Sequence, residues 1–162
     1  MIFINNIFSR TELLIGKDNL NKLKASKVAV VGLGGVGGAC AEALCRAGVR
    51  SVVLCDNDVF DVTNLNRQLF ATKDTLQKSK CKSAKERLLS INPDADITCI
   101  EAFYSSENRN LLFDTAPDFI ADAIDTVSSK LDLLETAHKR SVPIISCMGT
   151  GNRLDPTKFT LG

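Results

Sequence analysis

Glycine occupies four of the six positions in the segment Gly32-Leu33-Gly34-Gly35-Val36-Gly37, and no other feature of the sequence limits the fold as strongly. The segment directly follows the β-branched run Lys27–Val31, which favours a strand. The glycines would then form the turn between this strand and a helix that follows it. Such a turn can approach a phosphate closely, and the helix N-terminus adds free N–H donors. The segment therefore predicts a nucleotide site.

Strands and helices are expected to alternate along the rest of the chain. We expect strands at 27–31, 51–55, 97–101, 119–124 and 142–147. We expect helices at 9–24 with Ser9 as N-cap, from Val36 until Gly48 ends it, at 74–92 with Asp74 as cap, at 106–113 with Ser106 as cap, and at 127–140. Continuously apolar strands between helices are typical of a parallel sheet covered on both faces.

These elements predict an α/β fold, a Rossmann-like, doubly wound and mainly parallel sheet with helices on both faces. The expected spatial order is third, second, first, fourth and fifth strand. A ligand crevice would then lie at the carboxyl ends of the first and fourth strands, where the order reverses.

The length of 162 residues suits one domain. Within it we expect an N-terminal helix at 9–24, a core at 27–147 and an end, 148–162, that stops in mid-domain. No apolar run approaches the ~20 residues of a membrane-spanning helix, so we expect no membrane insertion within this span. The six cysteines form no Cys-x-x-Cys pair, which favours reduced, buried thiols of a cytoplasmic protein.

Charged residues near the expected crevice bear on which nucleotide it takes. Asp56 ends the second strand, where its carboxylate could accept the hydroxyls of a ribose. A long polar connection, 57–68, leads from there towards Lys78, Lys80 and Lys82, and Asp122 and Asp125 arrive with the fourth strand. Basic residues and a carboxylate for a metal favour Mg-ATP over a nicotinamide cofactor, whose pyrophosphate the loop amides alone can hold.

Several of these residues also have a purely structural interpretation. Lys78 and Lys82 are expected on a solvated helix face, and the lone His138 on the surface. Asp122 could cap or pair locally, and Asp58 and Asp61 could only organise a turn. Cys147 ends the fifth strand near the crevice, but no base for a reactive thiol is identifiable beside it.

A series of motifs follows one order and spacing along the chain. They are GLGGVG at Gly32–Gly37, Asp56-Asn57-Asp58, Thr63-Asn64-Leu65-Asn66-Arg67-Gln68, Lys80, Ile91-Asn92-Pro93 and Ala123-Ile124-Asp125. In these motifs, and from Phe8 to Phe159, the chain resembles the ThiF/MoeB/HesA family, the bacterial relatives of ubiquitin-activating enzymes. The resemblance implies adenylation of a carboxylate with Mg-ATP. Because the chain stops before the part of the family fold that completes the sheet, the resemblance also implies weak ATP binding or no turnover for this span alone.

The resemblance also implies roles for individual residues. The glycines Gly32, Gly34, Gly35 and Gly37 would hold phosphate and Asp56 the ribose, with Asp58, Gln68 and Thr126 also at the nucleotide. Asn64, Arg67 and Lys80 would contact the phosphates, and Asp125 would bind Mg²⁺. Arg10 matches an arginine that reaches the ATP of the other subunit of a homodimer. The residues expected to take part in catalysis are Arg67, Lys80, Asp125 and Arg10.

The substrate would depend on the branch of the family. Asp122–Val127 followed by Lys130, with Gly149-Thr150-Gly151 and Leu154-Asp155-Pro156, most resembles the branch that dehydrates threonylcarbamoyladenosine in tRNA. One alternative is adenylation of the C-terminus of a ubiquitin-like sulfur carrier. Two others are an NAD-dependent oxidoreductase and a non-catalytic nucleotide-binding or dimerisation module.

Overall fold

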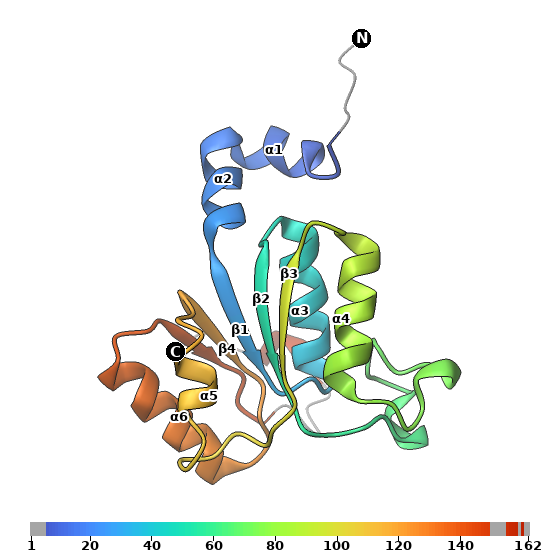
Figure 1. Cartoon of the computed structure of the whole chain (residues 1–162), viewed down its shortest axis with the longest axis vertical. Helices are drawn as coiled ribbons and strands as arrows, with labels where there is room; N and C mark the ends of the chain where they lie inside the picture. The colour runs from blue at the N-terminus through green and yellow to red at the C-terminus, as the bar shows by residue number, and fades with distance from the viewer. Residues whose placement is uncertain (1–5, 150–154, 159, 161–162) are drawn as a thin grey trace.

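A five-stranded, entirely parallel sheet runs through the middle of the molecule (Figure 1). The structure, a computed structural model, describes residues 6–149, 155–158 and 160. The strands are β1 (Lys27–Val31), β2 (Ser51–Cys55), β3 (Asp96–Ile100), β4 (Phe119–Asp122) and β5 (Ile144–Ser146). They lie in the order β3-β2-β1-β4-β5, which confirms the expected reversal beside β1.

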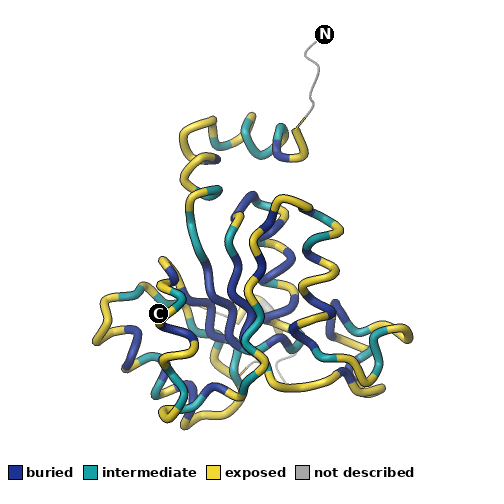
Figure 2. The backbone as a smooth tube through the Cα atoms, viewed as in Figure 1, coloured by how far each residue is buried: buried dark blue, intermediate teal, exposed yellow. Residues whose placement is uncertain are grey.

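Helices cover both faces of this sheet, as the apolar strands predict. On one face lie α3 (Gly35–Ala47) and α4 (Lys80–Ile91), and on the other lie α5 (Asn110–Phe113) and α6 (Val127–Lys139) (Figure 1). The buried apolar residues form two cores. Because side chains alternate along a strand, Val28 and Val30 of β1 belong to one core and Ala29 and Val31 belong to the other. Figure 2 shows the resulting band of buried strands between the more exposed helices.

The N-terminal segment differs from the single helix expected at 9–24. It forms α1 (Ser9–Ile15) and α2 (Lys17–Ala25), separated at Gly16, whose φ of 82° lies in the region that glycine tolerates. Ser9 is not the N-cap, because Phe8 holds that position and the Ser9 hydroxyl donates to the Asn6 carbonyl. Both helices stand beyond the amino ends of the strands, opposite the crevice (Figure 1).

The helix expected at 74–92 begins six residues later than predicted, at Lys80. Its N-cap is Ser79, whose hydroxyl accepts the Lys82 N–H, while Asp74 lies in a separate 3₁₀ turn (Lys73–Thr75). The helix expected at 106–113 is also shorter, because α5 begins only at Asn110 and Ser106 does not cap it. The strands expected at 119–124 and 142–147 shorten to β4 and β5, and β3 shifts by one residue.

The remaining regular segments are short. Two further 3₁₀ turns are Val62–Asn64 and Pro156–Lys158. Within the described residues, no helix has the length and apolar character needed to span a membrane. Thr150, Gly151 and Leu154, which belong to the motifs of the resemblance, lie outside the described residues, and the expectation that 148–162 ends in mid-domain stays a prediction.

Glu42 links the two helices on one face of the sheet. Its carboxylate lies 2.7 Å from Arg46 in α3 and 3.1 Å from Arg87 in α4. Burial alone would raise the pKa of Glu42, but its bonds to Arg87 and Arg46 outweigh that effect and lower the pKa below its usual value. The stabilisation is therefore complete above the pKa of an unfolded glutamate and is lost as pH falls through the lower folded pKa.

We expect Glu42→Gln to lower the free energy of unfolding by about 1 kcal/mol at neutral pH, because both arginine partners are half exposed. The difference between the two proteins should shrink as the pH falls, since wild-type Glu42 then becomes protonated as well. Urea denaturation of both proteins across this pH range measures it. A difference that stays constant down to acidic pH would contradict the role of these ion pairs.

Candidate functional site

An open cavity of about 860 Å³ lies at the carboxyl ends of β1, β2 and β4, where the crevice is expected. Its walls come from the glycine turn, the connection after β2, the start of α4, the loop after β3 and the turn after β4. Among the residues expected at the site, the cavity brings together Gly32, Gly34, Gly35, Asp56, Asp58, Asn64, Arg67, Gln68, Lys80, Asp125 and Thr126.

The glycines of the turn have two different roles, which are to allow close packing and to line the cavity. Gly32 has a φ of 89°, and a Cβ there would lie 2.6 Å from the Ala123 carbonyl oxygen, so only glycine fits between β1 and the turn after β4. Gly37 does not line the cavity. A Cβ at Gly37 would lie 1.7 Å from the Gly32 carbonyl oxygen. Gly37 therefore allows α3 to pack closely against the end of β1, while Gly32, Gly34 and Gly35 line the cavity.

Gly34 and Gly35 form the floor of the cavity at the N-terminus of α3. A Cβ at Gly34 would lie 4.0 Å from the Gln68 side chain, and one at Gly35 would lie 3.4 Å from the Arg67 carbonyl oxygen, which is ordinary contact. The protein itself therefore leaves room for a side chain at both positions. The free N–H groups and positive dipole end of α3 point at this floor and favour a bound anion.

We expect Gly35→Ala to fold normally and to bind a phosphate ligand poorly, because the methyl group would stand where the phosphate approaches the backbone. An added methyl group in a close contact costs about 1–3 kcal/mol, or roughly a ten- to hundredfold loss of affinity. Calorimetric titration with ATP and a thermal melt of the same variant measure the two effects. Unchanged ATP affinity would place the phosphates elsewhere.

Asp56 fastens the glycine turn to the end of β2. Its two carboxylate oxygens accept the N–H groups of Leu33 at 2.7 Å and Asp58 at 2.8 Å. Each carboxylate oxygen can accept a further hydrogen bond, so the residue can still receive a ribose hydroxyl. The carboxylate thus shapes the turn and lines the cavity at once.

Lys80 supplies a buried cation to the cavity wall. It is the first residue of α4, and its ammonium group lies 2.9 Å from the carboxylate of Asp58. The Lys80 side chain is only 8% exposed, whereas that of Asp58 is 59% exposed. An anion entering the cavity would meet an ammonium group already held in place, with a partner that can turn to solvent.

The connection between β2 and α4 carries three more polar residues to the cavity. Asn64 is buried and accepts the Asp61 N–H at 3.2 Å. The exposed Arg67 donates to the Thr63 carbonyl oxygen at 2.8 Å, which directs its guanidinium group along the wall. Gln68 is buried, and within the described part of the chain its side-chain oxygen has no hydrogen-bond partner.

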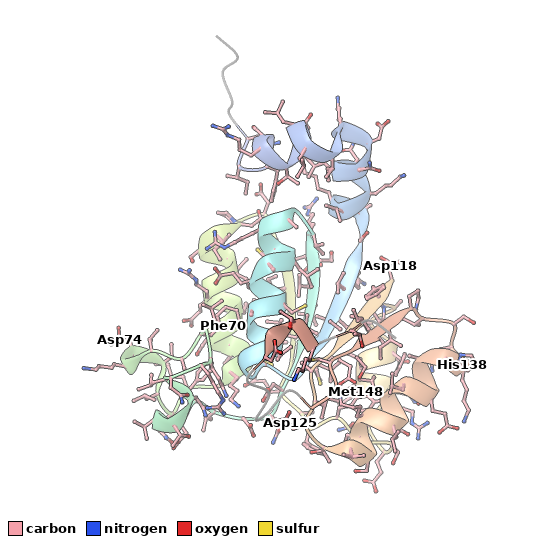
Figure 3. All side chains as sticks on the ribbon, turned by 180° about the vertical axis from the view of Figure 1, so that it is seen from behind. Phe70, Asp74, Asp118, Asp125, His138 and Met148 are labelled. Carbon is pink, nitrogen blue, oxygen red and sulfur yellow. The ribbon has the colours of Figure 1, made fainter. Side chains whose placement is uncertain are left out.

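The turn after β4 brings a carboxylate to the opposite wall. Asp125 is exposed and lines the cavity, and Thr126 follows as the N-cap of α6 (Figure 3). Asp122 differs, because its side chain is fully buried and forms an ion pair with Lys130 at 2.7 Å. Of the two aspartates that could hold a metal, only Asp125 is accessible, and the local pairing considered for Asp122 is confirmed.

No group of three or more His, Cys, Asp or Glu residues in the described part of the chain is arranged to hold a metal ion. A metal cage made by the protein alone is therefore not found there. Magnesium in phosphate-transfer sites commonly uses one or two carboxylates together with substrate phosphates and water. One accessible carboxylate, Asp125, fits that pattern when a polyphosphate supplies the other ligands.

Other candidates lie away from the cavity. His138 and Lys82 are exposed on helices, as expected, and His138 lies on α6 (Figure 3). Lys78 is exposed too, but it precedes α4 and does not lie on the helix face expected for it. Cys147 does not line the cavity. Arg10 is exposed on α1, beyond the other end of the sheet, so it does not reach the cavity of the same chain. Of the six free cysteines, Cys45, Cys55 and Cys81 are buried and Cys40, Cys99 and Cys147 are half-buried.

Sequence reasoning missed the wall formed by the loop after β3. Phe103 lines the cavity and is 48% exposed, an unusual state for phenylalanine that leaves a ring face available for stacking. Tyr104 anchors this loop to α6 by donating to Asp132 at 2.9 Å. Burial and the bond to Asp132 raise the pKa of Tyr104, so its hydroxyl keeps the proton it donates. No local pattern marks an aromatic residue in a loop as part of a site.

Known proteins resemble this chain in sequence and in fold. The model of the ThiF family matches residues 8–160. A tRNA threonylcarbamoyladenosine dehydratase of Bacillus subtilis is 45% identical over 154 residues, which are 95% of this chain and 61% of that protein. The sulfur carrier protein ThiS adenylyltransferase of the same species is 36% identical over 88% of this chain and 44% of its own length.

Solved structures agree with the sequence matches. The Escherichia coli tRNA N6-threonylcarbamoyladenosine dehydratase, TcdA, in complex with ATP superimposes with a TM-score of 0.90 at 34% identity, over 93% of this chain and 62% of that one. The same enzyme has also been solved with AMP, with a TM-score of 0.89. The chain spans about three fifths of the length of these two dehydratases and 44% of the length of the adenylyltransferase.

Proposed function

The chain belongs to the ThiF family, and from this premise we propose that its cavity binds Mg-ATP and that the protein activates a carboxylate by adenylation. The observation that carries the proposal is the convergence of Gly35, Arg67, Lys80 and Asp125 on one cavity. An NAD-dependent oxidoreductase would have no use for two cations and a carboxylate at the phosphate end. The similarity to a dehydratase solved with ATP also favours ATP over NAD.

The chemistry requires positioning more than proton transfer. A substrate carboxylate oxygen attacks the α-phosphorus of ATP, the bond from that phosphorus to the bridging oxygen breaks, and pyrophosphate leaves with the electron pair. The nucleophile is already ionised, so no general base is needed. Lys80, Arg67 and the N-terminus of α3 would neutralise the charge that grows on the phosphates. Asp56 would hold the ribose, and Asn64, Asp58, Gln68 and Thr126 would complete the pocket.

Asp125 would hold Mg²⁺, which when bound would supply positive charge that offsets the charge of the phosphates. This proposal is supported by Asp125 lining the same cavity as Lys80 and the glycine floor. That placement suits a carboxylate which binds a metal shared with the phosphates without itself contacting an anion.

We propose that the activated carboxylate is that of threonylcarbamoyladenosine in tRNA, in a cytoplasmic enzyme. Five of the similar curated proteins, from bacteria and yeast, are tRNA threonylcarbamoyladenosine dehydratases at 31–45% identity. The adenylate would then be closed into a ring by a nucleophile within the modified adenosine, with release of AMP. A ubiquitin-like sulfur carrier is the alternative substrate, supported by the similarity to the ThiS adenylyltransferase.

We also propose that the protein works as a homodimer in which Arg10 reaches the partner's ATP. The helix that carries Arg10, α1, buries none of its residues within the chain. Its Leu13 and Leu14 are 73% and 86% exposed, which favours cover by a second copy.

ATP–pyrophosphate exchange tests the proposed function. The full-length protein should incorporate labelled pyrophosphate into ATP when tRNA carrying threonylcarbamoyladenosine is added, and should not respond to tRNA that lacks the modification. Exchange that requires a ubiquitin-like carrier instead would assign the alternative substrate. ATP binding without any exchange would support the non-catalytic module, and absence of ATP binding would contradict the proposal as a whole.

A further inference from the structure

A buried cluster of polar groups lies beside the cavity, where β4 and β5 end. The ammonium group of Lys130, on α6, donates to Asp122 at 2.7 Å, to the hydroxyl of Ser146 at 3.2 Å and to the Cys147 carbonyl oxygen at 3.0 Å. The Ser146 hydroxyl also donates to the same oxygen of Asp122. The side chains of Lys130 and Asp122 are 9% and 0% exposed.

Every donor of the Lys130 ammonium group has an acceptor in this cluster. An ammonium group offers three N–H donors, and three protein oxygens receive them. The side chain is therefore held in one orientation, unlike that of a surface lysine. Because both charges are away from water, their attraction is strong and each depends on the other.

The second oxygen of Asp122 connects the cluster to the cavity. It accepts the N–H of Ile124 at 3.0 Å, a local side-chain-to-backbone bond that folds the chain just after β4. Asp125 is the next residue, and both Ile124 and Asp125 line the cavity. The orientation of Asp122 thus determines the path of the turn that carries Asp125.

The sheet does not depend on this cluster for its pairing. β4 and β5 are already joined by backbone hydrogen bonds, including those from Ile120 to the Pro143 carbonyl oxygen and from Cys147 to the Asp122 carbonyl oxygen, both 2.9 Å long. A buried ion pair is also often no more stabilising than apolar residues of similar volume. What the cluster adds is a fixed direction for the Asp122 carboxylate.

We propose that Lys130 is a positioning residue that, through Asp122, holds the turn 122–125 so that Asp125 faces the magnesium and phosphates of ATP. The part of this proposal that concerns ATP rests on the proposed function. Ser146 supports the same oxygen of Asp122 from β5. Partners that orient a metal-binding side chain commonly change metal affinity or activity by about 10- to 100-fold when they are lost.

Amide hydrogen exchange of Lys130→Met in the absence of nucleotide tests the structural part. Methionine keeps a similar length and removes the charge and all three donors. We expect faster exchange at Ile124, whose N–H donates to Asp122, with the amides of β1 and β4 still protected. The matched control is Lys139→Met on the same helix, where Lys139 pairs with the exposed Glu135. Unchanged exchange at Ile124, or equal acceleration throughout the sheet, would overturn the positioning role.

Nucleotide titration tests the functional part. In Lys130→Met, affinity for ATP with magnesium should fall about 10- to 100-fold, while affinity for ATP with EDTA should change little. Equal losses in both conditions would show a general defect and contradict the proposal. Should Lys130→Met fail to fold, Ser146→Ala removes one bond to Asp122 and keeps the ion pair, and it should show the same selective loss to a smaller degree. A wild-type protein that does not bind ATP would refute the proposed function, while hydrogen exchange would still decide the role of Lys130.

Discussion

Replacing Gly37 by alanine is expected to unfold the protein or to leave it barely stable. The new Cβ would lie 1.7 Å from the Gly32 carbonyl oxygen and 3.2 Å from the Ala123 side chain. Neither obstacle is the flexible end of a long side chain, so α3 would have to move away from β1. Ordinary overpacking costs about 1–3 kcal/mol, and a clash with backbone exceeds that, against a total stability of about 5–15 kcal/mol.

Gly38→Ala is the matched control for this prediction. A Cβ at Gly38 would lie 3.4 Å from the ring of Phe70, which is ordinary contact, and alanine favours a helix over glycine by about 1 kcal/mol. Urea denaturation should therefore show a midpoint near or above the wild type for Gly38→Ala and a severe loss for Gly37→Ala. Similar midpoints for the two variants would contradict the close approach of α3 to β1.

Lys80→Met is expected to lower the rate of ATP–pyrophosphate exchange by about 10²–10³-fold while the protein stays folded. The variant removes a buried cation from the phosphate end of the cavity, and the loss of one such preorganised donor typically costs that much in rate. The former partner, Asp58, is 59% exposed and can be solvated, so the cost to stability should be about 0–1 kcal/mol.

Lys82→Met provides the comparison on the same helix. Lys82 is 69% exposed and pairs with Glu101 outside the cavity. Its loss should leave exchange within about twofold of the wild type, since an exposed pair contributes little. Equal effects of the two substitutions would remove Lys80 from the phosphate site.

Local sequence patterns predicted the first half of the sheet better than its surroundings. β1 and β2 have the expected bounds because each is an apolar β-branched run with a sharp end, at Gly32 and at Asp56. The sharp end of the helix after the glycine turn was also predictable, because Gly48 adopts the left-handed conformation that ends α3.

The predicted start of α4 was wrong because the observed start depends on a contact with a residue outside the helix. Asp74 is an acceptable helix cap by residue type, but Phe60 exchanges backbone bonds with Gln77 and Lys78. That pairing, with Gln77 at a φ of 61°, keeps the chain out of a helix until Ser79, and no local pattern reveals it.

The candidate site was predictable where its residues follow strand ends. It was less predictable where burial determines the role of a residue. Asp56 and Asp125 follow parallel strands and must meet at one edge of the sheet. The roles of Gly37 and Asp122 were less apparent, because a close helix–strand contact and a buried partner are properties of packing. The role of Lys130 was equally hard to predict, since the sequence alone does not distinguish a buried lysine from an exposed one.

The most direct test of the central claim, that this cavity holds ATP by its phosphates, is calorimetric titration. The wild-type protein is titrated with ATP and magnesium and, separately, with NAD. The Gly35→Ala variant is titrated with ATP and magnesium. We predict saturable binding of Mg-ATP with one site per chain, affinity for NAD at least about tenfold weaker, and loss of ATP affinity in Gly35→Ala without loss of folding. Tighter binding of NAD than of ATP, or ATP affinity unchanged by Gly35→Ala, would contradict it.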